Sequence, residues 1–240
     1  MINISQLNSP SRVSKWINRT GTLRASVMGI NDGLVSNFCL VMGLAGGTNN
    51  DHQIVLIAAF IGLLAGSLSM AAGEYVSVRA QRDIYEKHVL YTLERLKRDH
   101  YGERTKLIDA YKTRGLSLSH ATTASTIMLS NERLAVETML KEEHGLSTEQ
   151  FGSPWGAALG SFLAFMLGAL VPIAPYMIPL TKDPFRVTIL ISVLFLALVG
   201  ATLSVLSDKS LWSGALRMLL FGSLAALATY VAGTLINQFI

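Results

Sequence analysis

The sequence predicts an all-α integral membrane protein with five transmembrane helices and a small cytoplasmic helical insert between spans 2 and 3. Half of its 240 residues are hydrophobic and only 15% are charged, a balance that is typical of membrane proteins with a modest soluble portion. The charged residues are also segregated, because residues 79–150 hold 12 of the 20 Lys and Arg and 11 of the 16 Asp and Glu. The chain is therefore divided into long apolar helices and one polar segment.

Five stretches are long and apolar enough to cross a membrane, since an α-helix needs about 20 apolar residues to span the ~30 Å hydrocarbon layer. They cover residues 28–47, 54–78, 156–180, 187–206 and 212–238. We therefore divide the chain into four parts: a cytoplasmic amphipathic N-terminal segment (1–26), transmembrane helices 1 and 2 (27–78), the insert (79–150) and transmembrane helices 3 to 5 (151–240).

The basic residues predict the orientation in the membrane. The segment before span 1 carries four Arg or Lys and no acid, the insert carries twelve, and the link GGTNNDHQ between spans 1 and 2 carries none. Because cytoplasmic loops are enriched in Lys and Arg, we expect the N-terminus and the insert to be cytoplasmic and the C-terminus to lie on the opposite side. Residues 10–26 fit either an interfacial helix or a simple anchoring flank.

Apolar residues keep a helical spacing through the insert. They predict a helix over 79–113 that continues from span 2, and a second helix over about 119–144. Gly115 and a following serine are the expected stop and restart, and Gly145 is the expected end of the second helix. The insert is therefore predicted to be a helical hairpin or a three-helix unit.

The same residues disfavour several classes of function. The net charge of +4 comes mostly from juxtamembrane or acid-interleaved basic residues, which suit anionic lipid headgroups rather than nucleic acid. The one cysteine, Cys39, allows no intrachain disulfide. A carboxylate di-iron enzyme would need paired Glu-x-x-His motifs, and the histidines at 88, 100, 120 and 144 have no glutamate three residues before them. We therefore expect neither an enzyme nor a nucleic-acid-binding protein.

Two carboxylates and one thioether are predicted to meet on the cytoplasmic side of the first two spans. Asp32 lies near the start of span 1 and Glu74 near the end of span 2, so the two residues have similar depths in oppositely directed helices. Met70 is one turn deeper than Glu74 on the same helix face. Ionisable groups inside a span usually mark a transport path. Each residue also has a simpler explanation: Asp32 as a helix N-cap, Glu74 as an interfacial residue and Met70 as packing.

These side chains favour a divalent transition metal as the ligand. Carboxylate oxygens suit ions such as Mn²⁺, and a thioether adds a preference for a softer ion such as Fe²⁺. Two carboxylates would neutralise a dication, and they would take up protons when the metal leaves. Competition between metal and protons for one site is the minimal requirement for exchange. We expect no permanently bound cofactor, because the metal would be the transported substrate.

The two spans that carry these residues resemble the signature spans of the vacuolar iron transporter family. The first reads GINDGLVSNFCLVMGLAGG (29–47), the second reads AGSLSMAAGEYVSVRAQRD (65–83), and GALVPIAPY (168–176) is similar to the family's third span. The resemblance covers nearly the whole chain in the number of spans, the position of the insert and the order of the motifs. It implies a homodimeric exporter of cytosolic Fe²⁺, in some members Mn²⁺, that is driven by proton exchange.

The resemblance also implies roles for individual residues. The family's transport site falls on Asp32 and Met70, and the glutamate of the GEY motif falls on Glu74. A second, glutamate-rich site in the family's cytoplasmic insert collects metal before transport. Its candidate residues in this chain are Glu86, Glu94, Glu103, Met139 and Glu143.

This chain departs from the family pattern at three positions. Plant members carry a further glutamate where this chain has Gly62, and our hypothesis is that Glu74 compensates for it. Two glutamates expected in the insert fall on Thr92 and Arg95. The collecting site is therefore either rebuilt from the nearby acids, weaker or absent. On the sequence alone, a solvated helical face is the simpler explanation of those acids.

The main alternative is a membrane-anchored metal-binding or sensing protein, in which the acidic insert binds metal and the spans only anchor it. For the transporter interpretation, the expected location is a prokaryotic inner membrane, or a vacuolar membrane if the chain is eukaryotic. The expected partners are metal ions, protons, the lipid bilayer and a second copy of the chain.

Overall fold

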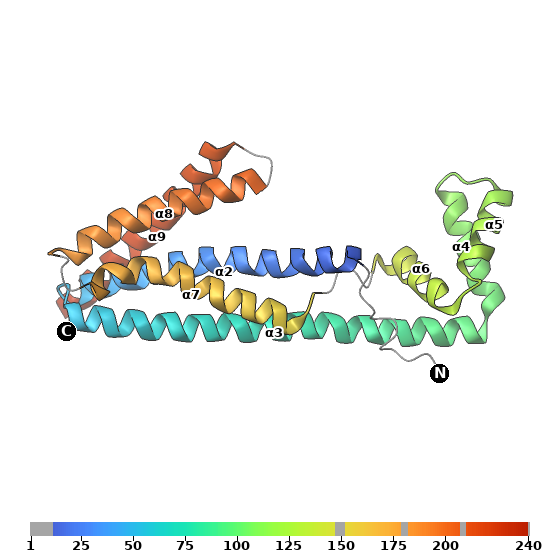
Figure 1. Ribbon diagram of the computed structural model, residues 1–240, viewed down its shortest axis with the longest axis horizontal. Helices are drawn as coiled ribbons and strands as arrows, with labels where there is room; N and C mark the ends of the chain where they lie inside the picture. Colours follow the sequence, from blue (N-terminus) through green and yellow to red (C-terminus); the bar gives the residue numbers. More distant parts are fainter. Residues whose placement is uncertain (1–11, 147–151, 179–181, 207–209, 240) are drawn as a thin grey trace. The chain divides into compact units, whose positions relative to one another are not determined.

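The computed structural model describes residues 12–146, 152–178, 182–206 and 210–239, and it describes the side chains of these residues except at 12–24 and 205–206. The described residues form α-helices and no β-strand (Figure 1), which confirms the predicted all-α fold class. In chain order the helices are α2 (Arg12–Gly47), α3 (His52–Arg98), α4 (His100–Thr113), α5 (Leu118–Met128), α6 (Glu132–His144), α7 (Pro154–Met177), α8 (Pro184–Leu206) and α9 (Leu211–Phe239).

Within the described residues, five helices are long and apolar enough to cross a membrane. The segments that meet both criteria are Ala25–Gly47, His52–Arg98, Pro154–Met177, Pro184–Ser204 and Leu211–Phe239. The five predicted spans are confirmed in number and order by length and composition. Residues 179–180, at the predicted end of span 3, lie outside the described residues.

The first helix begins well before the predicted first span. α2 runs without interruption from Arg12 to Gly47, so Asp32 lies in the interior of a helix. The explanation of Asp32 as an N-cap is therefore wrong. Residues 1–11 and the side chains of residues 12–24 lie outside the described part of the chain, and the interfacial role of this segment stays a prediction.

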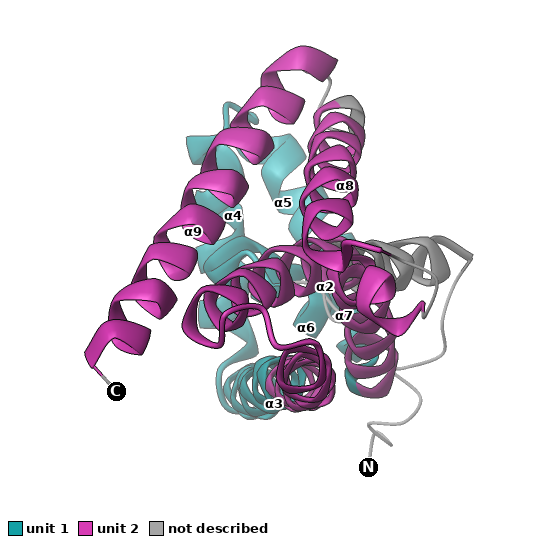
Figure 2. Ribbon diagram, turned by 90° about the vertical axis from the view of Figure 1, so that its left-hand side faces the viewer, with its two compact units in different colours: residues 1–21, 76–154 teal, residues 22–75, 155–240 magenta. Residues whose placement is uncertain are grey.

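The chain divides into two compact units (Figure 2). Unit 2 consists of Thr22–Tyr75 and Trp155–Ile240, and unit 1 is built on Val76–Pro154 together with Met1–Gly21. Helix α3 belongs to both, since it continues from His52 to Arg98. The prediction that span 2 continues into the polar segment is therefore confirmed.

Close contact between α2 and α7 organises unit 2. A Cβ added to Gly33 would lie 2.2 Å from the carbonyl oxygen of Phe165, and one added to Gly168 would lie 2.2 Å from that of Ile30. Small residues allow such backbone approach between helices that share an apolar environment. The apolar core that results contains Val41, Val55, Ala59, Leu63, Phe165, Ala169, Ile173 and Tyr176. This packing fixes α2, α3 and α7 around one another.

A tight polar turn joins α2 to α3. Asn49 and Asn50 have positive φ angles of 51° and 61°, a backbone conformation that asparagine tolerates better than most residues. Asp51 caps α3 by accepting hydrogen bonds from the backbone amides of Gln53 and Ile54, each at 3.0 Å. The turn makes α2 and α3 neighbours that run in opposite directions, as the pairing of Asp32 with Met70 requires.

Unit 1 contains two helix breaks that the apolar spacing did not reveal. α3 ends at Arg98, and Asp99 caps α4 by accepting a 2.8 Å hydrogen bond from the amide of Gly102. The predicted helix over 119–144 is divided into α5 and α6 by Asn131, whose side chain accepts from the amides at 133 and 134. Short polar side chains at N-caps offset the unpaired amides of the first helical turn. The predictions of one unbroken helix over 79–113 and of one over 119–144 are therefore wrong.

The predicted ends of α4 and α6 are confirmed. Gly115 follows the C-cap of α4 with a φ of 96°, and Gly145 is the C-cap of α6 with a φ of 64°. Ser117 is the N-cap of α5. The helices enclose a separate apolar core of Val89, Leu96, Leu107, Leu129, Ala135, Val136, Met139 and Leu140.

Candidate functional site

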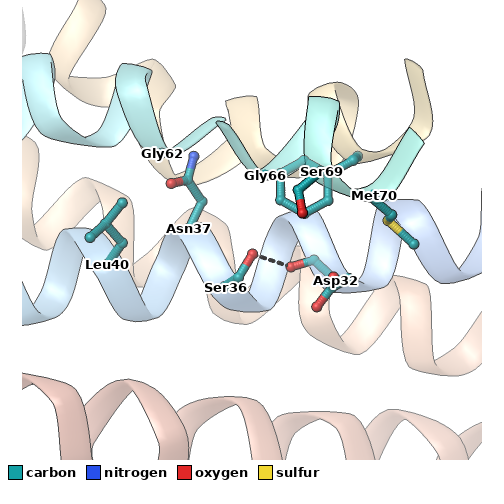
Figure 3. A pocket seen from close by; sticks show the side chains of 9 residues that line it. Asp32, Ser36, Asn37, Leu40, Gly62, Gly66, Ser69 and Met70 are labelled. Atoms are coloured by element: carbon teal, nitrogen blue, oxygen red, sulfur yellow. Dashed lines mark hydrogen bonds between the residues drawn. The ribbon is translucent and has the colours of Figure 1, made fainter. Parts of the chain in front are cut away.

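A cavity lined by polar and apolar residues lies between α2 and α3 within unit 2. It has a volume of about 340 Å³. Its lining residues are Asp32, Ser36, Asn37 and Leu40 from α2, Gly62, Gly66, Ser69 and Met70 from α3, and Phe165 from α7 (Figure 3). Four of these nine side chains carry oxygen and one carries sulfur, so the cavity offers several ligands that suit a cation.

Two glycines of α3 leave the space that the cavity occupies. A Cβ on Gly62 would lie 2.3 Å from a terminal carbon of Leu40, and a Cβ on Gly66 would lie 2.4 Å from the ring of Phe165. A larger residue at either position would push into the cavity wall. The closely spaced small residues of span 2 therefore shape the site as well as the packing.

The cavity joins two of the predicted transport residues. Asp32 and Met70 lie toward the same end of it, one on each helix (Figure 3). Asp32 is exposed at the protein surface and Met70 is half-buried. Among the described side chains, no basic group forms an ion pair with Asp32. A carboxylate and a thioether thus line one cavity without a cation supplied by the described part of the protein.

Glu74, the third predicted ligand, is not among the residues that line this cavity. It is half-buried and lies one helical turn beyond Met70 on α3. Its neighbour Tyr75 packs against Trp155, with ring centroids 4.8 Å apart. The structure therefore brings Asp32 and Met70 together and leaves Glu74 beside the cavity.

Three polar residues of the cavity were missed in the sequence. Ser36 and Ser69 are exposed, and Ser36 donates a hydrogen bond to the backbone carbonyl of Asp32. Asn37 is only 2% exposed. An amide in an otherwise apolar span is costly to bury without a partner, and that cost is the signal that would have marked Asn37 as a site residue.

The acidic residues of unit 1 are arranged around an arginine. The guanidinium of Arg95, on α3, donates to both carboxylates of the pair Glu103 and Glu143, which come from α4 and α6. Its bond to Glu143 measures 2.9 Å from Nη1, and a 3.2 Å bond joins its Nε to Glu103. Lys106 adds a 2.8 Å ion pair to Glu103. We call Arg95, Glu103 and Glu143 the arginine cluster.

Contacts within the arginine cluster shift the pKa values of Glu103 and Arg95. Burial raises the pKa of the Glu103 carboxyl, but the hydrogen bonds from Arg95 and Lys106 outweigh burial, and the net pKa is lowered. The hydrogen bonds from Arg95 to Glu143 and Glu103 raise the pKa of the guanidinium. The Glu103 carboxylate is therefore held in the charged form, and both carboxylates already contact a protein cation.

The other predicted ligands of the insert do not belong to the arginine cluster. Met139 is 2% exposed within the apolar core of unit 1, Glu86 is half-buried and Glu94 is exposed. Within the described ranges, no group of three or more His, Cys, Asp or Glu side chains is close enough to hold a metal ion. The insert site therefore stays a prediction.

These features define an α-helical membrane protein with a cavity, lined by polar and apolar residues, between its first two spans. A family model described as "VIT family" matches residues 23–234. A vacuolar iron transporter from Acanthamoeba castellanii is 31% identical over 90% of this chain and 78% of its own length. Vacuolar iron transporter homolog 2.1 from Arabidopsis thaliana is 30% identical, over 95% and 92%, and vacuolar iron transporter 1 from Eucalyptus grandis is 25% identical, over 87% and 84%.

The chain belongs to the VIT family. The predicted resemblance is confirmed over most of the chain, and it includes both helices that line the cavity.

Proposed function

We propose that this chain exports ferrous iron from the cytoplasm in exchange for protons, with Mn²⁺ as a second substrate. One observation carries the proposal: in a member of the VIT family, Asp32 and Met70 line one cavity between two oppositely directed helices. The names of the relatives support iron as the cargo. The export direction and the proton coupling are our proposals from the chemistry of the site.

The ligands explain how a divalent cation would be held. The carboxylate of Asp32 supplies negative charge and a hard oxygen, and the Met70 thioether supplies a soft ligand that favours Fe²⁺ over Ca²⁺ or Mg²⁺. The hydroxyls of Ser36 and Ser69 add neutral oxygens at the exposed side of the cavity. Together they would replace part of the hydration shell of the ion.

Proton exchange would follow from the same carboxylate. With the metal bound, the Asp32 carboxylate is stabilised by positive charge; after the metal leaves, it has no basic partner among the described side chains. An unpaired carboxylate on a membrane-spanning helix is costly, and protonation removes that cost. Metal and proton would therefore occupy Asp32 in turn.

The exposed position of Asp32 supports a homodimer as part of the proposal. A charged side chain does not stay in contact with hydrocarbon, so this face of α2 needs water, substrate or another protein surface beside it. A second copy of the chain would keep lipid away from the cavity. We also propose that the N-terminus and unit 1 face the cytoplasm, as the basic residues predict.

Flux measurements in proteoliposomes test this proposal. With an imposed proton gradient, the parent protein is expected to move Fe²⁺ and to dissipate the gradient as the metal moves. Metal flux without proton movement would contradict the exchange, and the absence of any flux would contradict transport itself. Metal binding that depends on unit 1 acids and not on Asp32, without flux, would instead support the membrane-anchored sensor.

A further inference from the structure

Asn37 is the most deeply buried of the polar side chains that line the cavity. It is 2% exposed, whereas Asp32, Ser36 and Ser69 are all exposed. It lies five residues after Asp32 on α2, which places its Cα about 7.5 Å further along the helix axis. In Figure 3 its side chain projects from α2 toward Gly62, at the other end of the cavity from Met70.

The orientation of the Asn37 amide follows from its one hydrogen bond. The Nδ2 group donates to the backbone carbonyl of Ala169 on α7 at 3.0 Å. A carbonyl only accepts hydrogen bonds, so the nitrogen must face α7 and the Oδ1 atom must face away from that carbonyl. α7 therefore fixes which atom of the amide is presented to the rest of the cavity.

The Oδ1 atom of Asn37 is directed toward Gly62 and has no donor. A Cβ built on Gly62 would lie 3.4 Å from it, and none of the described side chains or amides donates a hydrogen bond to it. The atom is not among the fully enclosed side-chain oxygens without a partner in the described residues, so it keeps some accessible surface. The absence of a side chain at Gly62 leaves room for an occupant next to this oxygen.

We propose that Asn37 Oδ1 is a neutral oxygen ligand for the transported cation at the buried end of the cavity. This inference rests on the proposed function. An ion path needs binding that is favourable enough for entry and weak enough for release. Asp32 supplies the charge that attracts the ion, and the uncharged amide deeper in the cavity holds the ion less tightly and lets it move on.

The role as a ligand predicts different effects for two substitutions of similar size. Asn37→Asp places a second carboxylate in the cavity, so it strengthens Mn²⁺ binding at least about fivefold and lowers the maximal transport rate. Asn37→Leu removes the oxygen and lowers the transport rate at least about tenfold, because a bare ion then meets an apolar wall.

Thr188 supplies the matched control. It is fully buried on α8, and its hydroxyl donates to the backbone carbonyl of Pro172 on α7 at 3.0 Å. Like Asn37, it therefore donates a hydrogen bond to a backbone carbonyl of α7, but it does not line the cavity. Thr188→Val removes that hydrogen bond and is expected to leave ion affinity and transport rates within about twofold of the parent.

The experiment measures Mn²⁺ affinity by electron paramagnetic resonance on detergent-solubilised full-length protein, and Fe²⁺ and Mn²⁺ flux in proteoliposomes. Thermal melts with and without Mn²⁺ separate folding from binding, since Mn²⁺ should raise the melting temperature of Asn37→Asp more than that of the parent. A folded Asn37→Leu with parental flux would overturn the inference, and so would parental Mn²⁺ affinity in Asn37→Asp or equal losses in Asn37→Leu and Thr188→Val.

The same data separate the inference from the proposed function. If the parent transports metal and the Asn37 variants match it, the inference fails and the transporter stands. If Mn²⁺ binds with the predicted dependence on Asn37 but no flux is seen, Asn37 stands as a cation ligand, and both the transporter and the role of Asn37 in transport fail. If the parent neither binds nor transports Mn²⁺ or Fe²⁺, both fail.

Discussion

Acidic side chains meet different partners in the two units of this chain. In unit 1, Glu103 and Glu143 both contact the guanidinium of Arg95. In unit 2, Asp32 lines a cavity with Met70 and has no basic partner among the described side chains. A carboxylate that a protein cation already neutralises is suited to holding helices together, whereas one without a partner is available to a cation from outside. Acidic residues alone therefore do not identify a metal site in this chain.

The largest expected effect is on Asp32. Asp32→Asn keeps the size of the side chain but removes its charge, and leaving a cation unpaired at low dielectric costs about 3 kcal/mol or more. We expect Fe²⁺ flux in proteoliposomes to fall at least about a hundredfold. Asp109→Asn, an exposed carboxylate on α4, is the control and should transport like the parent. Parental flux in Asp32→Asn would remove Asp32 from the transport path.

The next largest effect is expected in the arginine cluster. Arg95→Gln removes the guanidinium from Glu143 and leaves Glu103 with Lys106 alone, which destabilises unit 1 by about 2 to 4 kcal/mol. Hydrogen exchange of the full-length protein should show faster exchange in α4 and α6 and unchanged exchange in α2. Unchanged exchange in α4 and α6 would mean that the cluster contributes little to holding unit 1 together.

Substitution of Met70 should alter selectivity more than rate. Met70→Leu preserves volume and hydrophobicity but removes the soft ligand, so the preference for Fe²⁺ over Mn²⁺ should fall about fivefold. Competition between the two ions in the flux assay measures this ratio. Met166→Leu, a half-buried methionine of α7 outside the cavity lining, is the matched control. An unchanged ratio in Met70→Leu would assign Met70 to packing.

Acid should destabilise unit 1 through protonation of Glu103. Because the folded-state pKa of Glu103 is lowered, its contribution to stability is present above the ordinary glutamate pKa of about 4.3 and is lost as the pH falls through the folded-state value. The protection of α4 amides against hydrogen exchange should therefore fall on acidification below about pH 4. Glu103→Gln should show a smaller change over the same pH range; an equal change would assign the acid response to other groups.

The smallest effect is expected for Glu74. Because Glu74 does not line the cavity, Glu74→Gln should change Fe²⁺ flux by about twofold or less. Measured beside Asp32→Asn, this variant tests whether position in the cavity or carboxylate chemistry decides function. A loss as large as that of Asp32→Asn would support the earlier hypothesis that Glu74 replaces the carboxylate missing at Gly62.

Much of the fold could be predicted from the sequence because its main signals are local. Apolar length identifies the spans, and the glycines at 115 and 145 mark helix ends through backbone conformations that other residues rarely adopt. The breaks at Asp99 and Asn131 were missed because no glycine or proline marks them. Each depends on a short side chain that satisfies backbone amides, and the same residue types also occur inside helices.

The candidate site was harder to predict because its members are joined by packing. Helix direction and depth brought Asp32 and Met70 together correctly, but helix phase and the contact with α7 decide which other residues face the cavity. Asn37 is oriented by a carbonyl 132 residues away in the chain. The exclusion of Glu74 and the pairing of Arg95 with Glu103 and Glu143 likewise depend on contacts between helices that spacing along one helix does not specify.

The most direct test of this account is anomalous diffraction from crystals of the full-length protein soaked with Mn²⁺ or Fe²⁺. We predict an anomalous peak in the cavity beside Asp32 and Met70, and none between Glu103 and Glu143. A peak held by the unit 1 glutamates with an empty cavity would contradict the claim that the transported cation binds where the protein supplies no cation of its own.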